Sequence, residues 1–272
     1  FLAALLAASI APTPANAWKI CNVMDYGAKG DGKSMDTAAI NQAIAACAGQ
    51  GLVRLPAPGR YLSAPFNLTS DLEFRVETGA TLLASTAVAD WPVVAPLPSF
   101  GRGVENTGNM SGRHAAFIGG AHIRNVTLSG GGTIDGQGRV WWFRSGRLPG
   151  HAKTLVATRG RLVEPMFCED FVIRDLTLKD SPFWTLTPSY SQHIHIHDLR
   201  ITAPMDRIGN TDGVNLDSCR DAVVENIWIR NSDDGVCMKS GLDGFGMNLG
   251  GLAAFDVPEQ VFGHRDRFRV EI

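Results

Sequence analysis

The sequence predicts an all-β fold: a right-handed parallel β-helix, or solenoid, with a short N-terminal capping helix. Three observations predict it. A short strand motif recurs at nearly regular spacing, a helical pattern occurs once near the start, and thirty glycines in 272 residues suit many tight turns. With 44% hydrophobic residues and a formal net charge of -2, the chain can bury a sizeable core and lacks the basic bias of a nucleic-acid-binding protein.

The recurring motif has the form [Asn/Asp]-apolar-x-apolar. Its occurrences begin at Asn125, Asp175, Asp198 and Asn226, separated by 50, 23 and 28 residues. We expect one coil in each of the two shorter intervals and two coils in the first. Alternate residues of a strand face one side, so stacked coils can share a core that no single coil could bury.

The helix is predicted to follow Asp36, a good N-cap residue, and to end at Gly49-Gln50-Gly51. Its apolar residues repeat at helical spacing. They are Ala39, Ile40, Ala43, Ile44 and Cys47. We expect this helix to cap one end of the solenoid.

Residues 1–17 are predicted to be part of a signal peptide. An apolar run too short to span a bilayer is followed by Ala15-Asn16-Ala17, a small-x-small cleavage signal. We therefore expect export to the periplasm or secretion. Residues 18–250 are expected to form the β-helix, and residues 251–272, which contain no further coil motif, an unmatched tail. No later segment is long and apolar enough to span a membrane.

Five cysteines are scattered without a CxxC pair, so the sequence shows no zinc-ribbon spacing. In an oxidising compartment, Cys21 could pair with Cys47 and Cys219 with Cys237.

The strongest candidate site combines Asn210-Thr211-Asp212-Gly213 with Ser232-Asp233-Asp234-Gly235. Either motif alone would predict a surface turn, because aspartate before glycine is common in turns. Their separation, however, is about one coil, which would stack Asp212 on the paired aspartates. Crowding of like charges raises at least one carboxyl pKa. Glycoside hydrolysis needs such a division between a protonated acid and an ionised base.

These two motifs resemble the first two signature motifs of the polygalacturonase family, glycoside hydrolase family 28. Further segments from about Val23 to Gly241 are similar to the bacterial and plant members. They are 25–37, Leu55-Pro56, 79–82, 132–136 and Ser181-Pro182-Phe183-Trp184.

The resemblance implies inverting hydrolysis of α-1,4-linked galacturonan in pectin, without metal or cofactor. It implies that Asp233 is the general acid, that Asp212 and Asp234 position and deprotonate the attacking water, and that Asn210 and Lys239 line the substrate site. The expected partner is the polysaccharide substrate. We expect a monomer without nucleic-acid or membrane partners.

Two later motifs of the family, Gly-His-Gly and Arg-Ile-Lys, are missing, and Gly263-His264-Arg265 is a poor substitute. This predicts a truncated or frame-shifted gene product, or an incomplete record, and leaves the activity of this chain open. Two alternatives therefore stay open: a calcium-dependent pectic lyase, and a non-catalytic β-helical module for pectin binding or adhesion.

Four other patterns have a plainer explanation than a ligand site. Residues 27–34 match the phosphate-binding loop G-x-x-x-x-G-K-[S/T], but no βαβ pattern follows, so a glycine-rich turn is favoured. His193, His195 and His197 alternate with isoleucines, which favours histidines on the solvent face over a metal site. The aromatic clusters 141–143 and 183–184 are expected to be buried anchors rather than sugar platforms. Arg144, Arg147, Arg159 and Arg161 are expected to be solvated.

Overall fold

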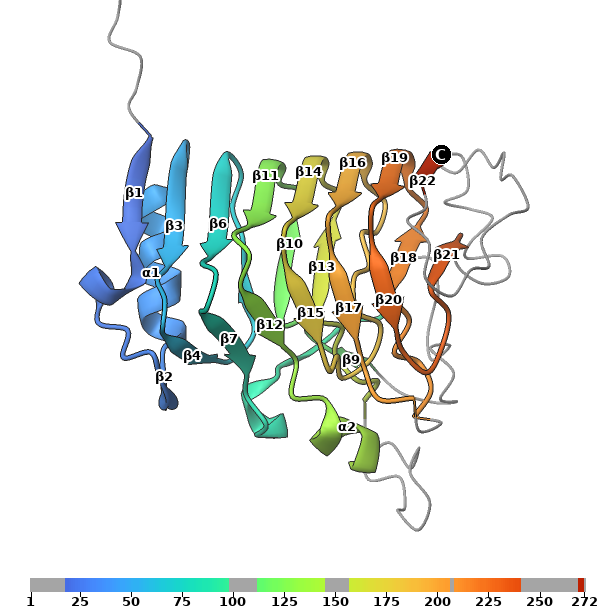
Figure 1. Cartoon of the computed structure of the whole chain (residues 1–272), viewed down its shortest axis with the longest axis horizontal. Helices are drawn as coiled ribbons and strands as arrows, with labels where there is room; N and C mark the ends of the chain where they lie inside the picture. The colour runs from blue at the N-terminus through green and yellow to red at the C-terminus, as the bar shows by residue number, and fades with distance from the viewer. Residues whose placement is uncertain (1–17, 98–111, 145–156, 206–207, 241–268, 272) are drawn as a thin grey trace, which may run out of the picture.

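The computed structural model describes residues 18–97, 112–144, 157–205, 208–240 and 269–271. The chain winds into a parallel β-helix in which successive coils add strands to the same three sheets (Figure 1). The predicted signal peptide and most of the expected tail lie outside the described residues.

Sheet 1 has eight strands, which are parallel except for the last, antiparallel one. In spatial order they are β1 (Lys19–Asn22), β3 (Gly51–Leu55), β6 (Leu72–Val76), β11 (Arg124–Ser129), β14 (Glu169–Arg174), β16 (Gln192–His197), β19 (Arg220–Glu225) and β22 (Arg269–Glu271).

Sheet 2 has seven parallel strands. They are β2 (Asp31–Met35), β4 (Arg60–Ser63), β7 (Thr81–Ala84), β12 (Thr133–Asp135), β15 (Thr177–Lys179), β17 (Arg200–Thr202) and β20 (Trp228–Arg230).

Sheet 3, which carries the candidate site, is more broken. It contains β5 (Phe66–Asn67), β10 (Ile118–Ala121), β13 (Val163–Met166), β18 (Val214–Asp217) and β21 (Val236–Lys239). Single bridges through Leu186 and Ser189 connect β13 to β18, so the five strands form one stack. The remaining short elements are η1 (Val23–Tyr26), η2 (Val88–Asp90), β8 (Val93–Val94), β9 (Arg113–His114) and α2 (Arg139–Arg144).

The core is built from in-register columns of apolar side chains. In sheet 1, one fully buried column joins five neighbouring coils: Phe74, Leu128, Ile173, Ile196 and Val224. In β14 and β16, buried residues alternate with partly exposed ones, as period-two patterning requires. The core along sheet 1 is therefore apolar, and the polar side chains of these strands lie on the outer face.

The recurring Asn/Asp of the motif lies two residues before a strand of sheet 2, where the chain makes a left-handed turn. Gly79, Gly131, Asp175, Asp198 and Asn226 occupy equivalent positions in successive coils, all with positive φ. Asparagine and aspartate tolerate this conformation better than other residues with a side chain. The side chain of Asn226 also donates to that of Asp198 in the coil before it.

One part of the repeat prediction is wrong. Asn125 lies in sheet 1, in register with Asp170 rather than with Asp175. The interval from Asn125 to Asp170 is a single long coil, because it includes α2 and residues 145–156. The later intervals, such as Glu169 to Gln192 and Gln192 to Arg220, are single coils of 23 and 28 residues.

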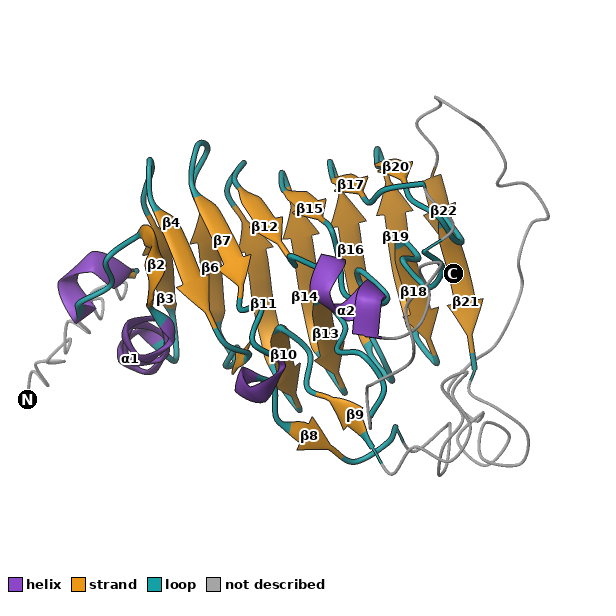
Figure 2. Cartoon of the chain, turned by 90° about the horizontal axis from the view of Figure 1, so that it is seen from below, coloured by secondary structure: helices purple, strands orange, loops and turns teal. Residues whose placement is uncertain are grey.

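The N-terminal helix is confirmed as α1 (Thr37–Cys47), which packs against β1 and β3 at one end of the stack (Figure 2). Its buried residues are those of the predicted apolar stripe. Asp36 occupies the N-cap position, but its carboxylate accepts from the amides of Lys29 and Gly30 instead of capping the helix.

The contacts of Asp36 also show that residues 27–34, which match the phosphate-loop pattern, form a turn. The amides of Lys29 and Gly30 donate to Asp36, at 2.6 and 3.1 Å, and those of Lys33 and Ser34 donate to Asp31, at 2.8 and 2.7 Å. A phosphate loop binds its ligand through backbone amides. Here two carboxylates of the protein already occupy those donors, so the segment is a turn leading into β2.

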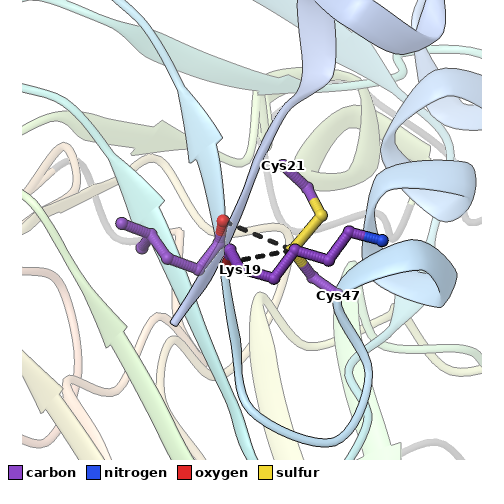
Figure 3. The surroundings of a disulfide bond; sticks show 4 residues. Lys19, Cys21 and Cys47 are labelled. Carbon is purple, nitrogen blue, oxygen red and sulfur yellow. Dashed lines mark hydrogen bonds between the residues drawn. A yellow bond between two sulfur atoms is a disulfide. The ribbon is translucent and has the colours of Figure 1, made fainter. Parts of the chain in front are cut away.

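The predicted disulfide between Cys21 and Cys47 is confirmed; it ties β1 to the end of α1 (Figure 3). It closes a loop with a sequence separation of 26 residues. Because a cross-link restricts the unfolded chain, we expect Cys21→Ala/Cys47→Ala to lower the free energy of unfolding by about 2–4 kcal/mol. Denaturant unfolding of both proteins under oxidising conditions measures this. Equal midpoints with equal slopes would contradict it.

None of the helices in the described part of the chain is long and apolar enough to span a membrane.

Candidate active site

The two aspartate motifs lie one above the other at the start of β18 and β21. Val214 is in register with Val236, and the amide of Gly213 donates to the carbonyl of Asp234 at 2.9 Å. Asp212 therefore stacks on Asp234 in the next coil. The predicted one-coil spacing is confirmed.

The side chains of Asp212 and Asp234 also meet. Ligand atoms of Asp212, Asp234 and Cys237 all lie within 4.8 Å of one another. Asp212 is only 2% exposed, whereas Asp234 is exposed. Burial raises the pKa of Asp212; Lys239 opposes this rise, and the charges of Asp233 and Asp234 add to it. This carboxyl group is therefore harder to ionise than a solvated aspartate.

Asp233 connects the two motifs through the backbone. One carboxylate oxygen accepts from the amide of Asn210 at 2.5 Å, and the other accepts from the amide of Asp234 at 2.9 Å. Its side chain is exposed. All three aspartates are thus in one patch, with Asp212 the most buried and Asp233 at the solvent side.

Lys239 is held inside this patch. Its Nζ lies 3.4 Å from Oδ2 of Asp212 and 4.4 Å from the centre of the Trp184 ring. Burial alone would lower the pKa of Lys239, but nearby Cys237 and Asp212 outweigh it and raise the pKa. The ammonium therefore stays charged beside the carboxylates.

The expectation of solvated arginines is wrong for Arg159 and Arg161, which are 5% and 1% exposed. Arg159 donates to Oδ1 of Asn210 at 2.9 Å and to the carbonyl of Pro182 at 3.0 Å, with its guanidinium over the Phe183 ring. This side chain thus holds Asn210 in place. Arg144 is exposed as expected, and Arg147 lies outside the described residues.

Arg161 belongs to a buried ionic group on the outer face of sheet 3. Glu164 lies between Arg113 and Arg161, with a carboxylate oxygen 2.5 Å from each guanidinium. Arg161 also covers the face of Trp184. Trp184 therefore lies in contact with two cations, Arg161 and Lys239. Of this group, the sequence analysis singled out only Arg161, and it did not predict that Arg161 is buried.

Asp217, at the end of β18 in sheet 3, is fully buried, and the sequence analysis did not predict it as a site residue. Burial raises its pKa to about 6, while Arg161 and Ser218 oppose the rise, Glu164 adds to it, and Lys239 again opposes it. Because the pKa of Asp217 is higher in the folded than in the unfolded state, the folded state binds its proton more tightly. The free energy of unfolding of the protein therefore falls as pH rises from about 4 to about 6.

We therefore expect Asp217→Asn to be more stable than the parent chain above pH 6, by up to about 3 kcal/mol, and nearly equal to it at pH 4. Denaturant unfolding of both proteins at several pH values between 4 and 7.5 measures the difference. A difference that does not change with pH would contradict the burial argument.

The predicted pair of Cys219 and Cys237 is wrong; both are free thiols. Cys237 is in register with Asn215, and Cys219 lies four residues farther along that chain segment. Cys219 follows the left-handed residue Ser218 beyond the end of β18, and its thiol donates to the carbonyl of Pro188, whereas the thiol of Cys237 lies beside Asp212 and Asn215.

The aromatic and histidine patterns follow the plainer explanations. Trp141, Trp142, Phe183 and Trp184 are buried. In β16, both isoleucines face the core, and the histidines lie outside, where His195 contacts Glu225 at 2.8 Å and His197 contacts Asp198 at 2.7 Å.

The fold and the site together define a β-helical protein with a cluster of three carboxyl groups on one sheet, which includes the pair of carboxyl groups that glycoside hydrolysis uses. Residues 47–249 match the family model described as glycosyl hydrolases family 28. The chain belongs to this family.

Similar proteins and a solved structure support the same family assignment. The chain is 39% identical to a probable polygalacturonase from Vitis vinifera over 84% of its own length and 46% of the relative's. It is 30% identical to a polygalacturonase from Persea americana, over 81% and 44%. A solved exopolygalacturonase from Thermotoga maritima superimposes with a TM-score of 0.72 at 22% identity, over 85% of this chain and 57% of that one. That structure and this chain share the right-handed parallel β-helix. The chain spans less than half the length of the two curated relatives.

Proposed function

We propose that this chain hydrolyses the α-1,4-galacturonosidic bonds of pectin or polygalacturonate by an inverting acid/base mechanism. The observation that carries the proposal is the stacking of Asp212 on Asp234 next to Asp233 in one patch of sheet 3. A glycosidase needs one carboxylic acid to protonate the leaving oxygen and one carboxylate to activate water.

Asp212 and Asp234 are suited to hold the water. Two carboxylate oxygens no more than 4.8 Å apart can both accept from one water molecule at about 2.8 Å each. The two side chains would orient a lone pair of that water and accept its proton as the bond to the sugar forms.

Asp233 is assigned the role of general acid, since it is the third carboxyl group of the patch and lies at its solvent side. An inverting enzyme keeps acid and base roughly 6.5–9.5 Å apart so that water can enter. When the glycosidic bond breaks, the proton of Asp233 goes to the leaving oxygen, and the water's proton goes to Asp212 or Asp234.

Lys239 and Asn210 are assigned to the substrate. The fixed ammonium of Lys239 gives the patch a positive charge, which suits a uronate carboxylate. Arg159 holds the Asn210 side chain and so positions it rather than contacting the sugar itself. We further propose that residues 18–250 form the catalytic β-helix, that the protein is exported through residues 1–17, and that it acts as a monomer with no nucleic-acid or membrane partner.

Incubation of the full chain with polygalacturonate in the presence of a chelator tests the proposal. New reducing ends are expected, with inversion at the anomeric carbon seen by NMR of the first product. Chelator-sensitive formation of unsaturated, ultraviolet-absorbing products would indicate the calcium-dependent lyase instead. Binding of oligogalacturonate without turnover would indicate the non-catalytic module. A retained anomeric configuration would reject the assigned roles while keeping a hydrolase.

A further inference from the structure

Cys237 lies among the stacked aspartates and has no part in the hydrolysis proposed above. Its Sγ lies 3.8 Å from Oδ2 of Asp212, and its thiol donates to Oδ1 of Asn215. The ligand atoms of Asp212, Asp234 and Cys237, which we name the Asp–Asp–Cys cluster, are mutually within 4.8 Å. The cysteine is half-buried, so an ion that reaches the aspartates also reaches the sulfur.

Asn215 gives an independent indication of a ligand. It is fully buried against this cluster, and its Nδ2 has no hydrogen-bond partner in the part of the chain that the structure describes. A buried donor without a partner costs about 1–3 kcal/mol. If Cys237 were a thiolate, rotation of the amide by half a turn would let Nδ2 donate to the sulfur. Burial raises the pKa of the Cys237 thiol to about 12, so the thiolate forms only where a bound cation displaces the thiol proton.

The buried carboxyl of Asp212 agrees with this. It is 2% exposed, and its Oδ1 also lacks a partner within the described residues. A second acceptor oxygen is therefore available beside the one that contacts Lys239.

We infer that the Asp–Asp–Cys cluster binds a divalent cation of borderline or soft character, such as Zn²⁺ or Cd²⁺, and that this ion blocks the active site. The S–H bond of Cys237 breaks, its proton goes to solvent, and a metal–sulfur bond replaces a metal–water bond. The blocking role rests on the proposed function, because the ion would occupy the place of the attacking water.

Ligand chemistry favours this class of ion over calcium. One thiolate and two carboxylates make three protein ligands for a tetrahedral Zn²⁺, with Zn–S near 2.3 Å and Zn–O near 2.0–2.2 Å. Calcium takes six to eight oxygen ligands and does not select a thiolate. The ammonium of Lys239, 3.4 Å from Oδ2 of Asp212, opposes any cation at this site, so binding requires Lys239 to move away from that oxygen.

Titration of the full chain with Cd²⁺ tests the site directly, since a cadmium–thiolate bond absorbs in the ultraviolet. One equivalent of Cd²⁺ is expected to produce the band, and excess chelator to remove it. Cys237→Ser should abolish the band. The matched control is Cys219→Ser, which removes a buried thiol that donates to the carbonyls of Pro188 and Asp217 and should leave the band intact.

The second measurement is the ratio of hydrolysis rates with and without Zn²⁺, taken for each variant so that differences in basal rate cancel. At a concentration ten times Kd, the parent chain should lose roughly tenfold in rate, whereas Cys237→Ser should lose little. A band that survives in Cys237→Ser, or no band in the parent chain, overturns the metal site. Absence of hydrolysis without metal overturns the proposed function instead, and the cadmium titration still decides the site.

Discussion

Replacing Asp233 by asparagine should lower kcat for polygalacturonate by about 10²–10⁴-fold, the usual contribution of a general acid or base. Asparagine is nearly isosteric and keeps an oxygen that can accept from the amide of Asn210 or of Asp234, so the turn should survive. What it loses is the proton for the leaving oxygen. The effect should therefore fall on kcat more than on KM.

The matched control for this substitution is Asp221→Asn. Asp221 is an exposed aspartate in β19 of sheet 1, away from the patch, and its replacement should change kcat less than twofold. Reducing-end assays on both variants give the comparison, and circular dichroism shows whether each is folded. A folded Asp233→Asn variant with parental kcat would remove Asp233 from the mechanism and require another acid.

The fold was predictable because one local signal recurs along the chain. A left-handed turn recurs before the strands of sheet 2, and only a few residue types fill it well: Asp175, Asp198 and Asn226 do so where earlier coils have glycine. The sequence motif detected this turn. It failed at Asn125, which occupies a different left-handed turn of the coil, because short motifs do not identify the sheet to which a strand belongs.

The stacking of Asp212 on Asp234 was predictable for a similar reason, since strand register converts a distance along the chain into a contact. The groups around it were not. Arg159 and Arg161 were expected to be solvated and Asp217 was not singled out, yet all three are buried. Burial of an outer face depends on the packing of distant segments, which strand periodicity does not encode.

The buried ionic group on sheet 3 should make Glu164→Gln strongly destabilising. Glu164 is 2% exposed and is the carboxylate that Arg113 and Arg161 share. Its neutral replacement keeps size and shape but removes the negative charge that the two buried guanidiniums share. Breaking a buried pair in this way costs about 3–5 kcal/mol.

Denaturant unfolding measures this cost, and Glu169→Gln provides the control, because Glu169 is half exposed in β14 and its loss should stay within about 0.5 kcal/mol. A cost below about 1 kcal/mol for Glu164→Gln would mean that solvent screens the two arginines. Arg161 also packs on Trp184, and Trp184 supports Lys239. Loss of Glu164 should therefore loosen the cation beside Asp212 and raise KM for an anionic substrate even where the protein remains folded, which connects the stability of the sheet to the charge of its site.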